Sequence, residues 1–247
     1  MKFTVISDTH NQHDHIKVSD ADMIIHAGDC TSTGTTRQIR EFCEWYGSLP
    51  HKYKILVAGN HDWGFEKDRK KHQKICEDNG IIYLQDDGVE IEGIKIWGSP
   101  QTPEFCDWAF NCWRNEKEYA WDRQQGNYGK GYDCITKYWD MIPDDTDIIV
   151  THGPPYDVLD KCPNPVGCEE LRRRVVDIEP KFHIFGHIHE GRGHVIHDYV
   201  DPELTYLDTM FINAAVLTGS YYPYGEATDV FSYEHQKMIG VDNGQYD

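Results

Sequence analysis

The chain has 247 residues, of which 39% are hydrophobic and 13% aromatic, and it carries a formal net charge of −18. A chain of this length and composition buries a sizeable core, which excludes a disordered protein. No apolar run approaches the roughly 18 residues of a membrane-spanning helix. The acidic surface disfavours long nucleic acids and anionic membranes as partners, whereas a small anionic substrate stays compatible because a bound cation reverses the local field.

The cysteines and the start of the sequence bear on the cell compartment. Eight cysteines occur without a Cys-x-x-Cys pair, and the chain enters a β-prone run at Phe3 without the layout of a signal peptide. We therefore expect reduced thiols, a cytoplasmic protein and no membrane partner. Cys30 directly follows Asp29, where a buried thiol is favoured over a metal ligand.

The first part of the sequence alternates short apolar runs with amphipathic segments. β-strands are predicted at residues 3–6, 23–26 and 54–58. A helix is predicted where apolar residues recur at helical spacing, at Ile39, Phe42, Cys43 and Tyr46. A second helix is predicted over residues 66–79. Strands that alternate with helices in this way predict right-handed βαβ units and a largely parallel sheet.

From residue 81 onward the predicted strands are shorter and more numerous. They lie at residues 82–84, 89–91, 94–97, 148–151, 182–185 and 211–214. Glu92-Gly93 predicts a tight hairpin turn between two of them. A helix marked by Leu171, Val175 and Ile178 separates two others, and an aromatic-rich segment spans residues 101–139.

We expect a single domain over residues 1–247, with a core at 1–218 and a Tyr-rich C-terminal extension at 219–247. No internal repeat and no linker rich in Pro, Gly or Ser divides the chain. The composition of the extension leaves two alternatives open. It packs either on the domain or on a neighbouring subunit of a homo-oligomer.

Polar clusters directly follow five of the predicted strands. They read Asp8-Thr9-His10, Gly28-Asp29, Gly59-Asn60-His61-Asp62, Thr151-His152-Gly153 and Gly186-His187-Ile188-His189. Each is weak alone, because an Asp often caps a turn and a lone buried His is more often a core residue than a ligand. In open α/β sheets, however, ligands bind beyond the carboxyl ends of the strands. The clusters therefore predict one metal site with nitrogen and oxygen ligands, which suits hydrolytic chemistry.

These motifs, in this order, resemble those of the calcineurin-like metallophosphoesterase superfamily over about residues 1 to 215. The resemblance implies an α/β fold of two packed mixed β-sheets flanked by helices, an αββα sandwich. Further stretches are similar to the metallophosphoesterase-domain-containing phosphodiesterases, at residues 83–86, 151–155, 166–168 and 185–191. Those proteins are related to the class III cyclic-nucleotide phosphodiesterases, which implies a phosphodiesterase acting on small nucleotide-like esters such as cyclic nucleotides.

The resemblance also implies a centre of two divalent cations with shared ligands. Asp8, His10, Asp29 and His189 would hold the first cation. Asp29, Asn60, His152 and His187 would hold the second, so that Asp29 bridges them. Some relatives carry Gly at the position of His187, which impairs the site. The presence of His187 in this sequence implies that both cation positions are functional. A ligand set without thiolate suits Mn²⁺, our first choice, and Fe, Zn²⁺, Co²⁺ or Ni²⁺ as alternatives.

The expected reaction uses Asp29 and His61 as catalytic residues. Cations bridged by Asp29 would lower the pKa of a shared water, and the resulting hydroxide would attack phosphorus in line. His61 would contact the substrate phosphate, and it would either protonate the leaving alkoxide or stabilise the developing charge.

The substrate contacts are predicted less directly. The candidates are Asn60, His61, Phe110, Asn111 and Arg192, with Arg114 and Trp63 as further ones. For each aromatic residue, core packing is the alternative. The alternatives to a phosphodiesterase are a phosphomonoesterase, a short-strand nuclease, and a nucleotide-binding regulator with little turnover.

Overall fold

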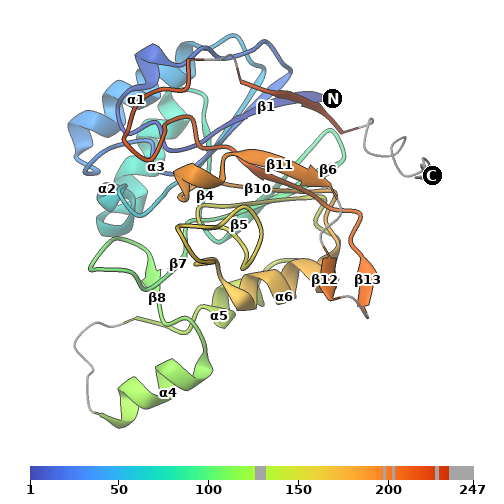
Figure 1. The fold of residues 1–247 in the computed structure, drawn as a ribbon. Helices are drawn as coiled ribbons and strands as arrows, with labels where there is room; N and C mark the ends of the chain where they lie inside the picture. The colour runs from blue at the N-terminus through green and yellow to red at the C-terminus, as the bar shows by residue number, and fades with distance from the viewer. Residues whose placement is uncertain (126–131, 197–198, 202–203, 226–227, 234–247) are drawn as a thin grey trace, which may run out of the picture.

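The computed structural model describes residues 1–125, 132–196, 199–201, 204–225 and 228–233. Two large β-sheets pack against each other, and helices lie on their outer faces (Figure 1). This arrangement confirms the expected α/β fold of two packed mixed sheets flanked by helices.

The first sheet has the strand order β15-β1-β2-β3-β4. Its strands are β15 (Val230–Ser232), β1 (Lys2–Ile6), β2 (Met23–Ala27), β3 (Tyr53–Val57) and β4 (Ile82–Leu84). β1 to β4 run parallel, as the βαβ pattern predicts, and β15 pairs antiparallel with β1. This part of the C-terminal extension thus packs on the first sheet, while residues 234–247 lie outside the described part of the chain.

The second sheet has the strand order β11-β14-β10-β9-β6-β5. Its strands are β11 (Gly193–Ile196), β14 (Met210–Asn213), β10 (Phe182–Phe185), β9 (Ile148–Thr151), β6 (Ile94–Ser99) and β5 (Asp87–Ile91). The four inner strands run parallel, and both edge strands are antiparallel to their neighbours. The predicted hairpin turn joins β5 to β6, with Glu92 at φ 51° and Gly93 at φ 80°.

Shorter elements lie outside these sheets. Two-stranded pairs form between β7 (Thr102–Pro103) and β8 (Asn111–Cys112), and between β12 (Tyr199–Asp201) and β13 (Leu204–Tyr206). Single 3-10 turns occur at η1 (His13–His15) and η2 (His189–Gly191).

The helices are α1 (Thr36–Ser48), α2 (Trp63–Lys67), α3 (Arg69–Asp78), α4 (Glu116–Gln124), α5 (Thr136–Trp139) and α6 (Glu169–Ile178). The prediction of one continuous helix over residues 66–79 is wrong. The chain breaks at Asp68, which has an extended φ of −150° and accepts a hydrogen bond from the backbone N–H of Lys71 at 3.2 Å. Asp68 therefore ends α2 and caps α3, so that the segment forms two helices.

The inner strands of both sheets are largely buried, because each sheet lies between the other sheet and a layer of helices. Val57 and Val150 lie in the core between the sheets. Phe42 of α1 packs in the cluster on the outer side of the first sheet, and Leu171 of α6 packs in the cluster on the outer side of the second. The clusters of expected site residues follow the strand ends, where this packing stops.

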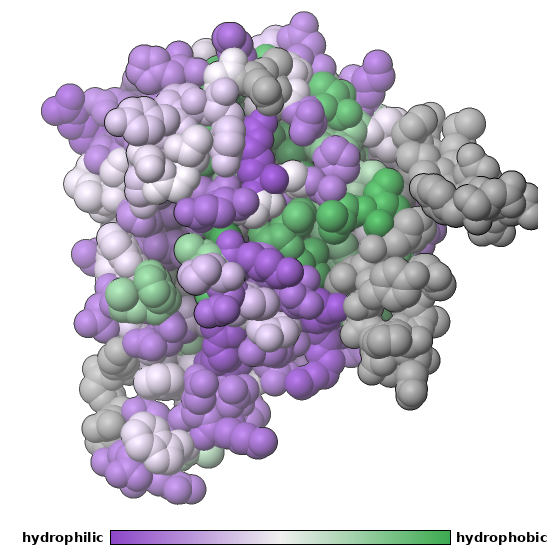
Figure 2. Space-filling view, viewed as in Figure 1, coloured by the Kyte–Doolittle hydropathy of each residue, from purple (hydrophilic) through white to green (hydrophobic). Residues whose placement is uncertain are grey.

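The surface agrees with the acidic, hydrophilic composition. Figure 2 shows a largely hydrophilic face, with hydrophobic residues gathered mainly at the level of β10 and β11 and in smaller patches elsewhere. Figure 1 shows α4 standing away from the two sheets. Within the described residues, no helix is long and apolar enough to cross a membrane.

Candidate metal centre

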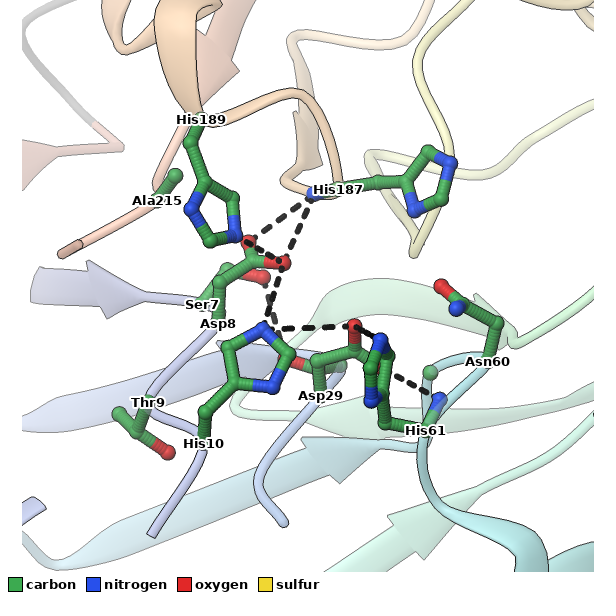
Figure 3. Close-up of polar contacts among 12 residues, drawn as sticks. Ser7, Asp8, Thr9, His10, Asp29, Asn60, His61, His187, His189 and Ala215 are labelled. Atoms are coloured by element: carbon green, nitrogen blue, oxygen red, sulfur yellow. Dashed lines mark hydrogen bonds and ion pairs between the residues drawn. The ribbon is translucent and has the colours of Figure 1, made fainter. Parts of the chain in front are cut away.

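The polar clusters that follow five strands meet at one edge of the two sheets. β1, β2 and β3 lead into Asp8, Asp29 and Asn60. β9 and β10 of the other sheet lead into His152 and His187. Figure 3 shows side chains from both sheets directed toward the same space. The strand-end placement predicted from the sequence thus brings all the expected ligands together.

The first group of donor atoms lies around Asp8. Its Oδ1 is 3.4 Å from Nε2 of His189 and 4.0 Å from Nε2 of His10. The ligand atoms of these residues all lie within 4.8 Å of one another. In Figure 3 the Asp8 carboxylate lies between the two imidazoles. This group contains three of the ligands expected for the first cation.

The second group lies around Asp29. Its Oδ2 is 3.3 Å from Nε2 of His152 and 3.6 Å from Nε2 of His10. Nε2 of His152 is also 2.9 Å from Oδ1 of Asn60. Asp29, His152 and His187 form a second cluster whose ligand atoms lie within 4.8 Å of one another. Asp29 therefore faces donor atoms of both groups, the position that a bridging ligand requires.

His61 lies beside Asp29. Its backbone N–H donates to Oδ1 of Asp29 at 2.8 Å, and its ring Nε2 is 4.0 Å from Oδ2 of Asp29. Nδ1 of His61 is 2.9 Å from the carbonyl oxygen of Ser32. A carbonyl only accepts hydrogen bonds, so Nδ1 carries the proton and Nε2 faces the centre.

The histidines are oriented in a way that fits metal binding. Nδ1 of His152 donates to the carbonyl of Ala27, and Nδ1 of His189 donates to the carbonyl of Thr218, both at 2.9 Å. Backbone carbonyls thus fix the tautomer that presents Nε2 to the centre, a common arrangement around metal-ligating histidines. Nε2 of His10 is buried without a hydrogen-bond partner among the described residues. Such an orphaned nitrogen is costly unless a cation completes it.

Strained backbone turns carry several of these side chains. Asp8, His10, Asp29 and His187 have φ values of 57°, 40°, 54° and 67°. Residues other than glycine pay about 1–3 kcal/mol for strained backbone conformations, which persist where the surroundings over-determine them. Here the backbone N–H of His187 donates to Oδ2 of Asp8 at 2.9 Å. A Cβ on Gly186 would lie 2.2 Å from the same oxygen, so this position admits only glycine.

Asp62, the last residue of the Gly-Asn-His-Asp cluster, connects the loops after β2 and β3. Its carboxylate accepts hydrogen bonds from the backbone N–H of Gly59 at 2.8 Å and from that of Thr31 at 2.9 Å. It also accepts a hydrogen bond from the thiol of Cys30. This thiol is buried, as expected, and is directed toward Asp62 and away from the donor groups. The sequence pattern carries no sign of this organising role, because it depends on contacts made 31 and 32 residues away.

Ion pairing sets the protonation states of the carboxylates. Burial alone would raise the pKa of Asp8, but a hydrogen bond from His189 holds it well below the ordinary range. Burial would likewise raise the pKa of Asp29, but the charge of His152 holds it low. Both side chains are therefore anionic ligands at neutral pH.

The histidines divide into two kinds. Burial would lower the pKa of His152, but the facing Asp29 raises it to about 9. Burial would also lower the pKa of His189, but its hydrogen bond to Asp8 raises it to about 9. By contrast, burial lowers the pKa of His187 to about 4. In the metal-free protein at pH 7, His187 is therefore neutral, while His152 and His189 are doubly protonated and positively charged.

The donor groups open onto a cavity of about 610 Å³. His61 forms part of its wall, and the indole of Trp108 stacks on the His61 ring, with centroids 4.1 Å apart and planes at 28°. The sequence did not single out Trp108. It lies in the aromatic-rich segment, where no local pattern distinguishes a wall residue from a core residue.

Three residues predicted to contact substrate lie in other surroundings than the cavity wall. Phe110 is 3% exposed and packs in the apolar cluster on the outer side of the first sheet. The side-chain amide of Asn111 donates a hydrogen bond to the carbonyl of Cys106 at 2.8 Å. Arg192 places its guanidinium over the ring of Tyr224, 4.5 Å from the centroid. None of the three is among the described residues that line the cavity, so their contact with substrate stays a prediction.

The two further candidates differ. Trp63 packs against the core cluster that contains α1, with Lys67 over its ring, which favours the packing alternative. Arg114 does line the cavity.

Metal binding should release protons at neutral pH. His152 and His189 have pKa values near 9 without metal, and both must be neutral to act as ligands. The apparent affinity for Mn²⁺ is therefore expected to rise with pH up to about 9. Calorimetric titration at pH 7 in buffers of different ionisation enthalpy measures the release. Equal heats in all buffers would contradict these assignments.

Comparisons with known proteins agree with the fold and the centre. The model of the calcineurin-like phosphoesterase family matches residues 1–191. Metallophosphoesterase domain-containing protein 1 of Homo sapiens is 35% identical over 247 residues, covering 90% of this chain and 68% of that protein.

Two solved structures share the fold at low sequence identity. Phosphopantetheinyl hydrolase from Mycobacterium tuberculosis is 13% identical with a TM-score of 0.57, over 91% of this chain and 93% of the other. TT1561 of Thermus thermophilus is 14% identical with a TM-score of 0.53, over 86% and 88%. The match to the family and the 35% identity decide the assignment. The chain belongs to the calcineurin-like phosphoesterase family, and is thereby a metal-dependent phosphoric ester hydrolase.

Proposed function

We propose that the chain is a metal-dependent phosphodiesterase that hydrolyses small, nucleotide-like phosphodiesters. The observation that carries the proposal is a cluster of nitrogen and oxygen donors, centred on Asp29, on the wall of a cavity with aromatic sides. Asp8, His10, Asp29 and His189 would hold one cation, and Asp29, Asn60, His152 and His187 would hold the other. Bound divalent cations supply a water activated at neutral pH and positive charge for the phosphoryl oxygens.

His61 acts on the substrate in this proposal. Its Nδ1 is held by the Ser32 carbonyl, and its Nε2 faces the space beside Asp29. Stacking on Trp108 fixes the plane of the ring. A fixed imidazole at this place hydrogen-bonds a phosphoryl oxygen, and in its protonated form it donates a proton to the leaving alkoxide.

The charge of the cavity wall supports a diester over a monoester. Among the described residues that line the cavity, Arg114 is the one arginine or lysine. Its guanidinium is already bound by the carboxylate of Glu169 at 2.8 Å and by the carbonyl of Gly167 at 2.7 Å. Glu104 and Glu190 also line the wall. A diester carries one negative charge and suits this wall better than a doubly charged terminal phosphate.

The shape of the wall supports a flat organic group next to the phosphate. Phe105 is 62% exposed and lines the cavity together with Trp108 and Tyr156. Aromatic faces stack on bases, which contributes about 1–3 kcal/mol per base in single-stranded nucleic acid complexes. The acidic surface disfavours long strands, so the fitting ligand is a mononucleotide or dinucleotide ester.

Hydrolysis of bis-p-nitrophenyl phosphate tests the reaction class. With Mn²⁺ we expect release of p-nitrophenol, and a kcat/KM for this diester above that for p-nitrophenyl phosphate, because the one arginine of the described wall is already paired. A panel of cyclic nucleotides and dinucleotides then identifies the preferred ester. A folded protein that cleaves only the monoester would show a phosphomonoesterase, and one that cleaves neither with any divalent cation would overturn the proposal.

His61→Ala should separate catalysis from metal binding. We expect the turnover rate to fall by about 10²–10⁴-fold, the usual contribution of an acid or base group. The metal content, measured by atomic emission, is expected to stay at the wild-type value. His15→Ala is the matched control, because His15 is exposed in η1. Loss of metal in His61→Ala would show that His61 is a ligand instead.

A further inference from the structure

Where the core meets the C-terminal extension, residues 218–222 form a turn beside the metal centre. Thr218 provides the carbonyl that orients the imidazole of His189. Three residues later, the ring of Tyr221 lies edge-on to two of the expected ligands, with centroids 5.0 Å from His10 and 5.2 Å from His189. Tyr221 also lines the cavity. The same turn therefore orients one ligand and brings a phenol to the donor groups.

The backbone of this turn is held firmly. Tyr221 has a φ of 61°, a strained conformation for a bulky residue. Its N–H donates to the carbonyl of Thr218 at 2.7 Å, and its carbonyl accepts from Nε2 of Gln12 at 2.9 Å. The N–H of Thr218 donates to the carbonyl of Tyr222 at 2.8 Å. These contacts maintain the strained conformation and with it the position of the Tyr221 ring.

The hydroxyl of Tyr221 is available to a ligand. Within the described residues no hydrogen bond holds it, and the side chain belongs to a residue that is 46% exposed. The neighbouring Tyr224 differs, because its hydroxyl donates to the carbonyl of His189 at 3.1 Å. A tyrosine hydroxyl ordinarily loses its proton only at about pH 10, so at pH 7 it donates one hydrogen bond.

We propose that Tyr221 is a substrate-binding residue, whose hydroxyl donates a hydrogen bond to a phosphoryl oxygen on the side of the centre formed by His10 and His189. His61 lies next to Asp29 and Trp108. This inference rests on the proposed function for its substrate, but it needs only that the metal-loaded site binds a phosphoryl group. Phosphate oxygens gain most from donors that are held in place before binding, and the fixed turn supplies that.

Tyr221→Phe tests the inference, because it removes the hydroxyl and keeps the ring packed against the two imidazoles. Binding of inorganic phosphate to the Mn²⁺-loaded protein, measured by calorimetry, is expected to weaken about 10-fold, in keeping with a hydrogen bond to a charged group. We expect kcat/KM for bis-p-nitrophenyl phosphate to fall by a similar factor. Metal content and melting temperature should not change. The matched control is Tyr222→Phe, because Tyr222 is 71% exposed and is not among the described residues that line the cavity.

The outcomes separate this inference from the proposed function. Weaker phosphate binding in Tyr221→Phe supports the inference even if the wild type cleaves no diester, a result that overturns only the proposed function. If Tyr221→Phe cleaves the diester and binds phosphate as well as the wild type does, the inference is overturned and the proposed function stands. Loss of metal in Tyr221→Phe, or a wild type that binds no phosphate, also overturns it. Equal losses in Tyr222→Phe would show a general effect of the turn and would overturn it as well.

Discussion

The carboxylate of Asp29 is the group on which the centre depends. It is 2% exposed, lies within 4.0 Å of nitrogens of His10, His61 and His152, and accepts the backbone N–H of His61. A buried anion is tolerated only when nearby charges and donors compensate it. In the metal-free protein, protonated His152 provides that compensation. Bound cations would take over this role, and His152 would then serve as a ligand instead of a counter-ion.

The architecture explains how ligands from five loops reach one place. Parallel strands in both sheets end at the same edge, and after β1, β2 and β10 the chain turns sharply through Asp8, Asp29 and His187, which have positive φ. Close packing between the loops leaves no room for side chains at Gly28 and Gly59, where a Cβ would lie 2.3 Å from His152 and from Asp29. The strain is concentrated at the site, and the apolar sheets below it supply the stability that maintains it.

The fold, and the meeting of the expected ligand residues at one edge of the sheets, could be predicted because their signals are local. Each ligand follows a short apolar run, and strand ends in such sheets converge by geometry. The break at Asp68 was missed because the helical pattern continues across it, and only the capping contact to Lys71 shows two helices. Trp108 and Tyr221 were missed for a different reason. They reach the site from irregular segments, and no periodicity in the sequence records which distant residues such segments contact.

The predicted contacts of Phe110 and Asn111 illustrate the same limit. Both lie in the aromatic-rich segment, but the short β7–β8 pair positions Asn111 toward the carbonyl of Cys106, and Phe110 packs in the core. The neighbouring Trp108 takes the place at the wall instead. A difference of two or three residues in a loop decides which side chain faces the cavity, and this depends on packing against the rest of the chain.

The central claim is that Asp29 serves two cations at once. The most direct test is the metal content of Asp29→Asn compared with that of Asn60→Ala, measured on folded protein saturated with Mn²⁺ and then freed of unbound metal. The account predicts two equivalents in the wild type, loss of both in Asp29→Asn, and loss of only one in Asn60→Ala, because Asn60 belongs to a single donor group. Retention of one equivalent at wild-type affinity in Asp29→Asn would contradict the bridging role.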